Sequence, residues 1–287
     1  MMKNVIVWCL GVCLLGFTSC NIINPDEPVP QYIHIDSFQV VSYDDSYHGS
    51  VSKNITEAWV YVDNFNVGNF QLPADIPVVV EGEDSVRLSI AAGIKVDGRS
   101  LSRRRYPFYT RYNQLLAKSA TKQTIIPTIE YRGGQDFKLI EDFENGNSFI
   151  PYTSPDTGLA RTSLPQYVND GANGGLIFLD GTNRTARVTT VQDFSFVSNK
   201  ESFLELDYKC DIPFTVEVQL VTLGSTVIIT DLLSINIRED WNKIYINLTE
   251  IGQNYAGSKV NFILKAGLTP GQTSGFVAVD NFKIISQ

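Results

Sequence analysis

The chain has 287 residues, a formal net charge of −8 at pH 7, 43% hydrophobic residues and four cysteines. This length is enough for two domains of ordinary size. An acidic chain is repelled by phosphate backbones and by anionic lipid headgroups. The composition therefore argues against nucleic acid as a partner and against electrostatic docking on a membrane.

The first 20 residues have the pattern of an export signal. Lys3 supplies a positive start, residues 5–17 are uncharged and mostly apolar, and small residues precede Cys20. An apolar stretch of about 13 residues is too short for a transmembrane helix, which needs ~20. The segment resembles a bacterial lipoprotein signal, with Phe17 in place of the usual leucine. That resemblance implies a signal peptide over 1–19, lipidation of Cys20 and an outer-membrane anchor at the cell surface. The alternative is an ordinary signal peptide that ends in a chance cysteine.

Residues 20–31 read as an extended tether, because Pro25, Pro28 and Pro30 interrupt a stretch without periodicity. After the signal and Cys20, the only cysteine is Cys210, so an internal disulfide is excluded. Cys210 alternates with Leu206 and Tyr208, which predicts a small buried hydrophobic residue.

Residues 32–132 are rich in short strand patterns separated by Gly, Asp and Asn. The only helix candidate, 112–118, is too short to form a layer. This spacing predicts an antiparallel β-sandwich of immunoglobulin-like type. The strand segments are 32–38, 56–62, 76–80, 86–90 and 125–131.

Residues 132–136 form the clearest internal boundary, and strand patterns restart at 137. About nine strands with almost no helical period predict a second sandwich over 137–287, with jelly-roll topology. The predicted fold class is therefore all-β, with two β-sandwich domains. The strand segments are 137–143, 176–179, 186–191, 202–210, 214–223, 226–233, 244–248, 260–266 and 275–285.

Two sets of motifs carry a family resemblance. The order of 58–63, Gly68, 72–78 and 93–98 resembles the N-terminal β-sandwich of uncharacterised surface lipoproteins of the Bacteroidota. The second half opens on Phe143-Glu144-Asn145-Gly146 and closes on Val279-Asp280-Asn281-Phe282. These motifs are similar to carbohydrate-binding jelly rolls of the galactose-binding-like type. The resemblance implies a glycan ligand for the second domain and no assigned activity for the first.

Catalytic patterns are scarce. His34 and His48 are the only histidines, no Gly-x-Ser-x-Gly motif occurs, and no His/Cys cluster suits zinc. The chain is therefore predicted not to be an enzyme. A glycosidase needs only two carboxylates beside a cleft, and 31 acidic residues leave that alternative open.

A sugar platform is predicted in the segment 241–248. Alternation places Trp241, Lys243, Tyr245 and Asn247 on one face of a strand, and this mixture of rings, cation and amide suits sugars. The alternative is that these side chains pack at the edge of the sandwich. The resemblance adds four candidate rim residues, Tyr152, Tyr167, Arg184 and Arg187.

The same resemblance implies a structural calcium between the first and last strands of the second domain. Glu144 and Asp280 occupy the matching positions, with Asp142 nearby, and calcium prefers carboxylate oxygens. The alternative is a strand irregularity at 280–281 that uses its own side-chain hydrogen bonds. No cofactor is otherwise required.

Arginines concentrate in the segment 99–111, interleaved with aromatic residues. The segment is either a site for an acidic glycan or a protein partner, or a polar loop whose aromatics return to the core. The leading hypothesis for the whole chain is a non-catalytic surface lipoprotein that binds a polysaccharide through its second domain. The first domain would then be a spacer or a contact to an outer-membrane protein. The alternative is a structural or adhesive surface protein that binds other proteins.

Overall fold

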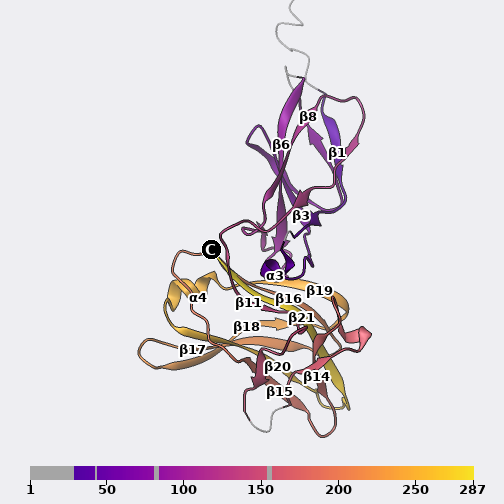
Figure 1. The fold of residues 1–287 in the computed structure, drawn as a ribbon. Coiled ribbons are helices and arrows are strands. Elements are labelled where there is room, and N and C mark those ends of the chain that lie inside the picture. The colour runs from indigo at the N-terminus through magenta and orange to yellow at the C-terminus, as the bar shows by residue number, and fades with distance from the viewer. Residues whose placement is uncertain (1–28, 43, 81–83, 154–156) are drawn as a thin grey trace, which may run out of the picture.

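The computed structural model describes residues 29–42, 44–80, 84–153 and 157–287, which form two β-rich lobes (Figure 1). Cys20, the signal segment and most of the tether lie outside the described residues, so lipidation and export stay predictions. None of the helices in the described ranges is long and apolar enough to cross a bilayer.

The N-terminal lobe consists of short strands grouped, within the described residues, into three sheets. Their strand orders are β5-β1-β9, β10-β2 and β4-β3-β6-β7, and β8 also pairs with β6. A short helix, α3 (Asp45–His48), lies against the second lobe. The strands are β1 Gln31–Ile35, β2 Gln39–Val40, β3 Glu57–Val62, β4 Phe65–Gln71, β5 Ala74–Val78, β6 Ser85–Lys95, β7 Arg103–Arg105, β8 Arg111–Ala117, β9 Gln123–Thr124 and β10 Thr128–Ile129.

The helix predicted over 112–118 is wrong, because this segment is strand β8. It pairs antiparallel with the long strand β6, from Ala117 opposite Ser85 to Arg111 opposite Ala91. Leu116 points into the core and is 1% exposed, whereas its neighbours Leu115 and Ala117 face solvent. Pairing with β6 therefore decides the structure of a segment whose composition favours a helix.

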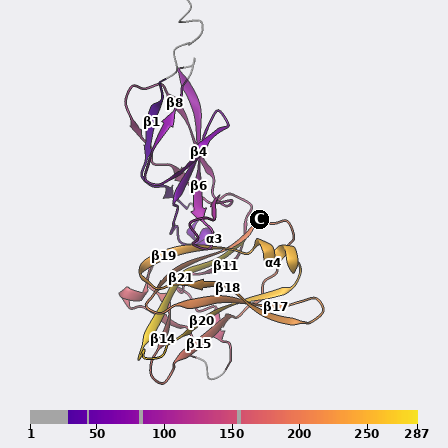
Figure 2. The ribbon, with the colours of Figure 1, turned by 180° about the vertical axis from the view of Figure 1, so that it is seen from behind.

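The C-terminal lobe is a sandwich of two sheets, seen below the first lobe in Figures 1 and 2. A six-stranded sheet has the order β13-β14-β21-β16-β19, with β11 also paired to β21, and a five-stranded sheet has the order β12-β15-β20-β17-β18. The elements are β11 Asp136–Glu141, β12 Phe149–Pro151, β13 Ala160–Thr162, η1 Pro165–Tyr167, β14 Gly174–Leu179, β15 Thr185–Thr190, β16 Ser202–Cys210, β17 Phe214–Val221, β18 Val227–Ile235, β19 Arg238–Asn247, α4 Thr249–Asn254, β20 Lys259–Gly267 and β21 Gly275–Ser286.

The sandwich core forms where the inner faces of these two sheets meet. Alternate residues of each strand, such as Val216, Val218 and Leu220 of β17, are at most 1% exposed. Cys210 lies in this core and is fully buried, which confirms its prediction as a small buried hydrophobic residue. The all-β prediction is likewise confirmed.

The middle of the six-stranded sheet is buried on both faces, because the N-terminal lobe covers part of its outer side. Phe203 of β16, Tyr245 of β19 and Ile285 of β21 belong to the hydrophobic core of the first lobe. This explains why β16 and β21 are buried along nearly their whole length, a pattern typical of strands covered on both sides.

An ionic cluster lies in this interface between the lobes. Glu205 is fully buried and pairs with Lys243 at 2.8 Å. It also accepts hydrogen bonds from the hydroxyls of Tyr106 at 2.5 Å and Tyr131 at 2.8 Å. Burial alone would raise the pKa of Glu205, but Lys243 and Lys283 outweigh it and hold that pKa below its usual value. Glu205 is therefore the anionic centre of the interface.

Candidate functional site

The platform predicted on the face of Trp241 is a contact between the lobes and not an open sugar surface. Tyr245 is 1% exposed, and its hydroxyl accepts a hydrogen bond from the backbone N–H of Asn54 at 3.2 Å. Lys243 is 4% exposed, and the backbone N–H of Asn247 donates to Asp97 Oδ1. Trp241 remains half-buried. The shared face was predicted correctly, but protein covers Lys243 and Tyr245, so they are not available to stack on a sugar.

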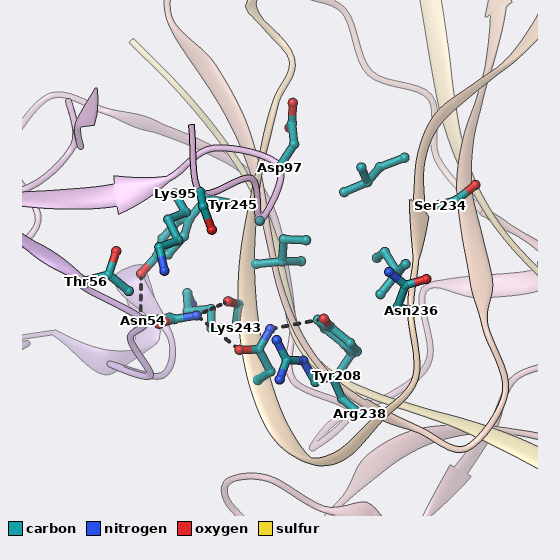
Figure 3. A pocket seen from close by; sticks show the side chains of 16 residues that line it. Asn54, Thr56, Lys95, Asp97, Tyr208, Ser234, Asn236, Arg238, Lys243 and Tyr245 are labelled. Carbon is teal, nitrogen blue, oxygen red and sulfur yellow. Dashed lines mark hydrogen bonds between the residues drawn. The ribbon is translucent and has the colours of Figure 1, made fainter. Parts of the chain in front are cut away.

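A polar cavity of about 370 Å³ opens beside this contact (Figure 3). The Asn54 amide donates to Asn242 Oδ1 at 3.1 Å and to the Lys243 carbonyl at 2.9 Å, which fixes one wall. Lys95 comes from the first lobe and Arg238 from the second, and neither side chain has an ion pair among the described residues. Domain junctions of this kind are frequent positions for small-molecule sites.

A second cavity of about 500 Å³ adjoins the first. Both are lined by residues 234–236 at the end of β18, so this segment separates the two spaces. Arg187 of β15 and Lys265 of β20 line the second cavity, with the Thr215 and Ser234 hydroxyls 3.3 Å apart. The cavity therefore combines an apolar floor with cationic and hydroxyl groups, a composition suited to a sugar.

Arg187 and Lys265 belong to a polar cluster on the outer face of the five-stranded sheet. We call it the sheet-face cluster, and it consists of Tyr152, Arg187, Glu217, Gln219 and Lys265. The Arg187 guanidinium lies 4.3 Å from the centre of the Tyr152 ring and donates to Glu217 Oε2 at 2.8–2.9 Å. The Tyr152 hydroxyl donates to Gln219 Oε1 at 2.7 Å, and Lys265 pairs with Glu217 at 3.0 Å.

The carboxylate of Glu217 holds this cluster together. Burial would raise the pKa of Glu217, but the hydrogen bonds and charges of Lys265 and Arg187 outweigh burial and lower it. Glu217 is therefore ionised near neutral pH and fixes both cations over the sheet. Asp231 lies directly opposite Glu217 on β18 and is exposed. The general acid of a glycosidase stays protonated, so the ionised Glu217 does not suit that role.

The predicted rim residues separate into two sets. Tyr152 and Arg187 come together in the sheet-face cluster. Tyr167 instead packs its ring against Phe276 at 4.9 Å, and Arg184 donates to the backbone carbonyls of Thr269 and Gln272. These contacts keep Tyr167 and Arg184 apart from the cluster.

The carboxylates predicted to bind calcium accept hydrogen bonds from backbone N–H groups. Both N–H groups of Ala172 and Asn173 donate to Glu144 Oε1, at 2.7 and 2.8 Å. Asp280 accepts from the N–H groups of Asn169, Asp170 and Asn281. No group of three or more His, Cys, Asp or Glu side chains in the described part of the chain is placed to hold a metal ion. Asp142 accepts from the Glu144 N–H. The carboxylates therefore anchor these loops, and a structural calcium at this position stays a prediction.

The sequence interpretation missed Glu217, Gln219 and Lys265. The signal was present: in β17, Glu217 and Gln219 alternate with the core residues Val216, Val218 and Leu220. Polar side chains at every second position mark the outer face of a strand. These side chains contact Tyr152 only because β12, β15, β20 and β17 are neighbours in the sheet, and alternation within one strand does not predict that order.

Comparison with known proteins shows structural likeness without sequence likeness. No protein-family profile and no curated protein matches the sequence. Solved carbohydrate-binding β-sandwiches are similar to about half of the chain. The CBM22-1 xylan-binding domain from Paenibacillus barcinonensis Xyn10C covers 54% of this chain and 97% of its own, with 12% identity and a TM-score of 0.39.

Two further structures have comparable scores. The family 11 carbohydrate-binding module of the Clostridium thermocellum cellulase Lic26A-Cel5E covers 53% of this chain and 94% of its own, with 15% identity and a TM-score of 0.36. The enzymatically active domain of the bacteriophage CBA120 tailspike protein 4 covers 57% of this chain and 26% of its own, with 9% identity and a TM-score of 0.38. Scores below 0.5 assign no function, so the side chains decide what the site can bind.

Proposed function

We propose that this protein binds a glycan without catalysis, through the outer face of the five-stranded sheet. The observation that supports the proposal is the sheet-face cluster beside a cavity of about 500 Å³. Sugar sites combine an aromatic surface with a few fixed polar groups, and cavities of roughly 300–1,000 Å³ are typical of ligand sites.

Each side chain has a defined part in this proposal. Tyr152 supplies the aromatic surface, and Arg187 and Lys265 donate hydrogen bonds to hydroxyl or ring oxygens. The exposed carboxylate of Asp231 accepts from sugar hydroxyls. Because Glu217 already holds both cations in place, their side chains lose little freedom on binding. The adjoining cavity between the lobes gives a chain room to continue past residues 234–236.

The cell-envelope position is part of the same proposal. The signal pattern of residues 1–19 and Cys20 motivates a lipid anchor, with the binding domains held outside the membrane. Metabolic labelling with a palmitate analogue tests this directly. Label that disappears in Cys20→Ser supports the anchor, and label that persists contradicts it.

A polysaccharide panel tests glycan binding. The protein spanning 29–287, which contains both hydrophobic cores, is run through native gels that contain xylan, galactan or mixed-linkage glucan. At least one polysaccharide should retard wild type. Arg187→Gln should weaken that binding about tenfold, since a charged hydrogen bond contributes roughly 1.5–3 kcal/mol. Tyr152→Ala should also weaken it, because the aromatic surface is lost.

The control is Arg161→Gln, an exposed arginine on β13 of the other sheet, and it should bind like wild type. Trp241→Ala should also retain binding, because its face contacts the first lobe. Retardation lost in Trp241→Ala but kept in Arg187→Gln would place the site between the lobes. Silence across the panel, together with concentration-dependent self-association, would favour the adhesive alternative.

A further inference from the structure

The outer face of the N-terminal sheet carries a second, separate set of polar and aromatic side chains. Strand register places residues in rows across β4, β3, β6 and the β7–β8 edge. Inward positions such as Ala58, Val60 and Ala92 are at most 1% exposed, so their neighbours face outward. The outward rows are Asn66–Tyr61–Ser89–Asn113, Asn69–Trp59–Ala91–Arg111 and Gln71–Glu57–Gly93–Arg105.

Small residues along the middle of this face let the large ones reach across it. Ser89, Ala91 and Gly93 occupy alternate positions of β6, on its outward side. A side chain at Gly93 would lie 2.9 Å from the Trp59 indole, so that ring lies over the glycine. The Arg111 guanidinium crosses β6 and lies 4.8 Å from the centre of the Tyr61 ring. The face thus presents two ordered aromatic rings, with exposed amides of Asn66, Asn69, Gln71 and Asn113 around them.

Two cations of this face lack anionic partners. Within the described residues, neither Arg105 nor Arg111 makes an ion pair, whereas Arg103 pairs with Glu57 at 3.3 Å and Arg104 pairs with Glu201. The charges of Arg105 and Arg111 also lower the pKa of Arg132, after burial, whereas Glu201 raises it. Unpaired cations gathered in a chain of net charge −8 mark a place for an anion.

We infer that this face, which we call the Trp59–Arg111 face, binds an acidic polysaccharide whose sugar units carry carboxylates. Trp59 and Tyr61 provide ring surfaces, the amides bond to hydroxyls, and Arg105 and Arg111 pair with carboxylates through bidentate forks. Arginine forks match planar carboxylates, and relief of their mutual repulsion adds to binding. This site is on a different domain from the sheet-face cluster and does not depend on it.

Affinity electrophoresis of the 29–287 protein in gels with polygalacturonate tests this inference. Fully methyl-esterified polygalacturonate, the same chain without charge, is the matched ligand control. The variant Arg105→Gln/Arg111→Gln should weaken binding at least about tenfold, since two charge-assisted hydrogen-bonding groups are lost. The double variant Lys118→Gln/Lys122→Gln removes the same charge from the same domain. Lys118 lies seven positions beyond Arg111, roughly 23 Å along β8, and this variant should bind like wild type.

Two further variants keep the outcome decisive. Trp59→Ala should weaken binding without changing the charge, and thermal melting of each variant confirms that it is folded. Arg187→Gln should leave polygalacturonate binding unchanged, so this inference and the proposed glycan site can fail separately. No binding by wild type in low salt, equal binding of the esterified chain, or equal binding by the Arg105→Gln/Arg111→Gln variant overturns the inference. Equally tight binding of double-stranded DNA also overturns it, because charge alone would then be recognised.

Discussion

Removing the carboxylate of Glu205 is expected to destabilise the protein strongly. Glu205→Ala leaves the charge of Lys243 buried, with only Asp207 at 4.0 Å as an ion-pair neighbour. It also leaves the hydroxyls of Tyr106 and Tyr131 without their acceptor. Removal of one partner from a buried ion pair typically costs about 3–5 kcal/mol, a large share of the roughly 5–15 kcal/mol that stabilises a domain.

Urea unfolding followed by tryptophan fluorescence measures this cost. The 29–287 protein has one tryptophan in each lobe, Trp59 and Trp241, so the signal reports on both. The unfolding midpoint of Glu205→Ala should fall by at least ~1 M urea, given slopes of about 1–3 kcal/mol/M. Glu201→Ala is the control, because its pair with Arg104 is about one-third exposed and is expected to contribute no more than ~1 kcal/mol. Equal effects of the two variants would refute the central role of Glu205.

Three further predictions concern charged side chains of the second lobe. Burial lowers the pKa of Lys283 to about 8, so stability should rise as the pH increases from 8 toward 10.5, and Lys283→Met should remove that rise; an equal rise in the variant would contradict this. Burial raises the pKa of Asp280 to about 7. The protonated Asp280 therefore contributes its full stabilisation below pH 4, and this stabilisation is lost as the pH rises through 7. Asp280→Asn should flatten the dependence of the unfolding free energy on pH, and an unchanged pH profile would contradict this prediction. The carboxylates of Glu144 and Asp280 already accept hydrogen bonds from backbone N–H groups, so a chelator should leave the melting temperature unchanged. A fall of several degrees would support the predicted calcium site.

Sequence patterns located most strands of the second lobe because its core faces alternate regularly. The segment 202–210 was predicted with the bounds that β16 has, and its inward residues Leu204, Leu206 and Cys210 are fully buried. Here the two-residue period, the aromatic residues Phe203 and Tyr208, and the flanking turn residues all agree.

The first lobe was harder to predict because several of its strands carry weak local signals. Strand β4 (Phe65–Gln71) contains Gly68 and three Asn or Gln residues and was overlooked. It is a strand because β3 pairs with it, and pairing between distant segments has no short-range signature. Strand β8 was assigned to a helix for the same reason.

The Trp241 face shows a different limit of sequence reasoning. Alternation correctly predicts which side chains share a face, but not whether solvent, ligand or another domain covers it. Rings, cations and amides suit a protein interface as well as a sugar. Likewise, Glu205 alternates with the core residues Leu204 and Leu206 of β16, a pattern typical of a solvent-facing side chain, yet it is buried because the first lobe covers it with Tyr106 and Tyr131.

The most direct test of the proposed function is a crystal structure with an oligosaccharide from the panel polysaccharide that retards the wild-type protein most strongly. The account predicts sugar density on the five-stranded sheet, against Tyr152 and within hydrogen-bonding distance of Arg187 or Lys265. Density only elsewhere on the molecule, or a panel without any binder, would contradict glycan binding at the sheet-face cluster.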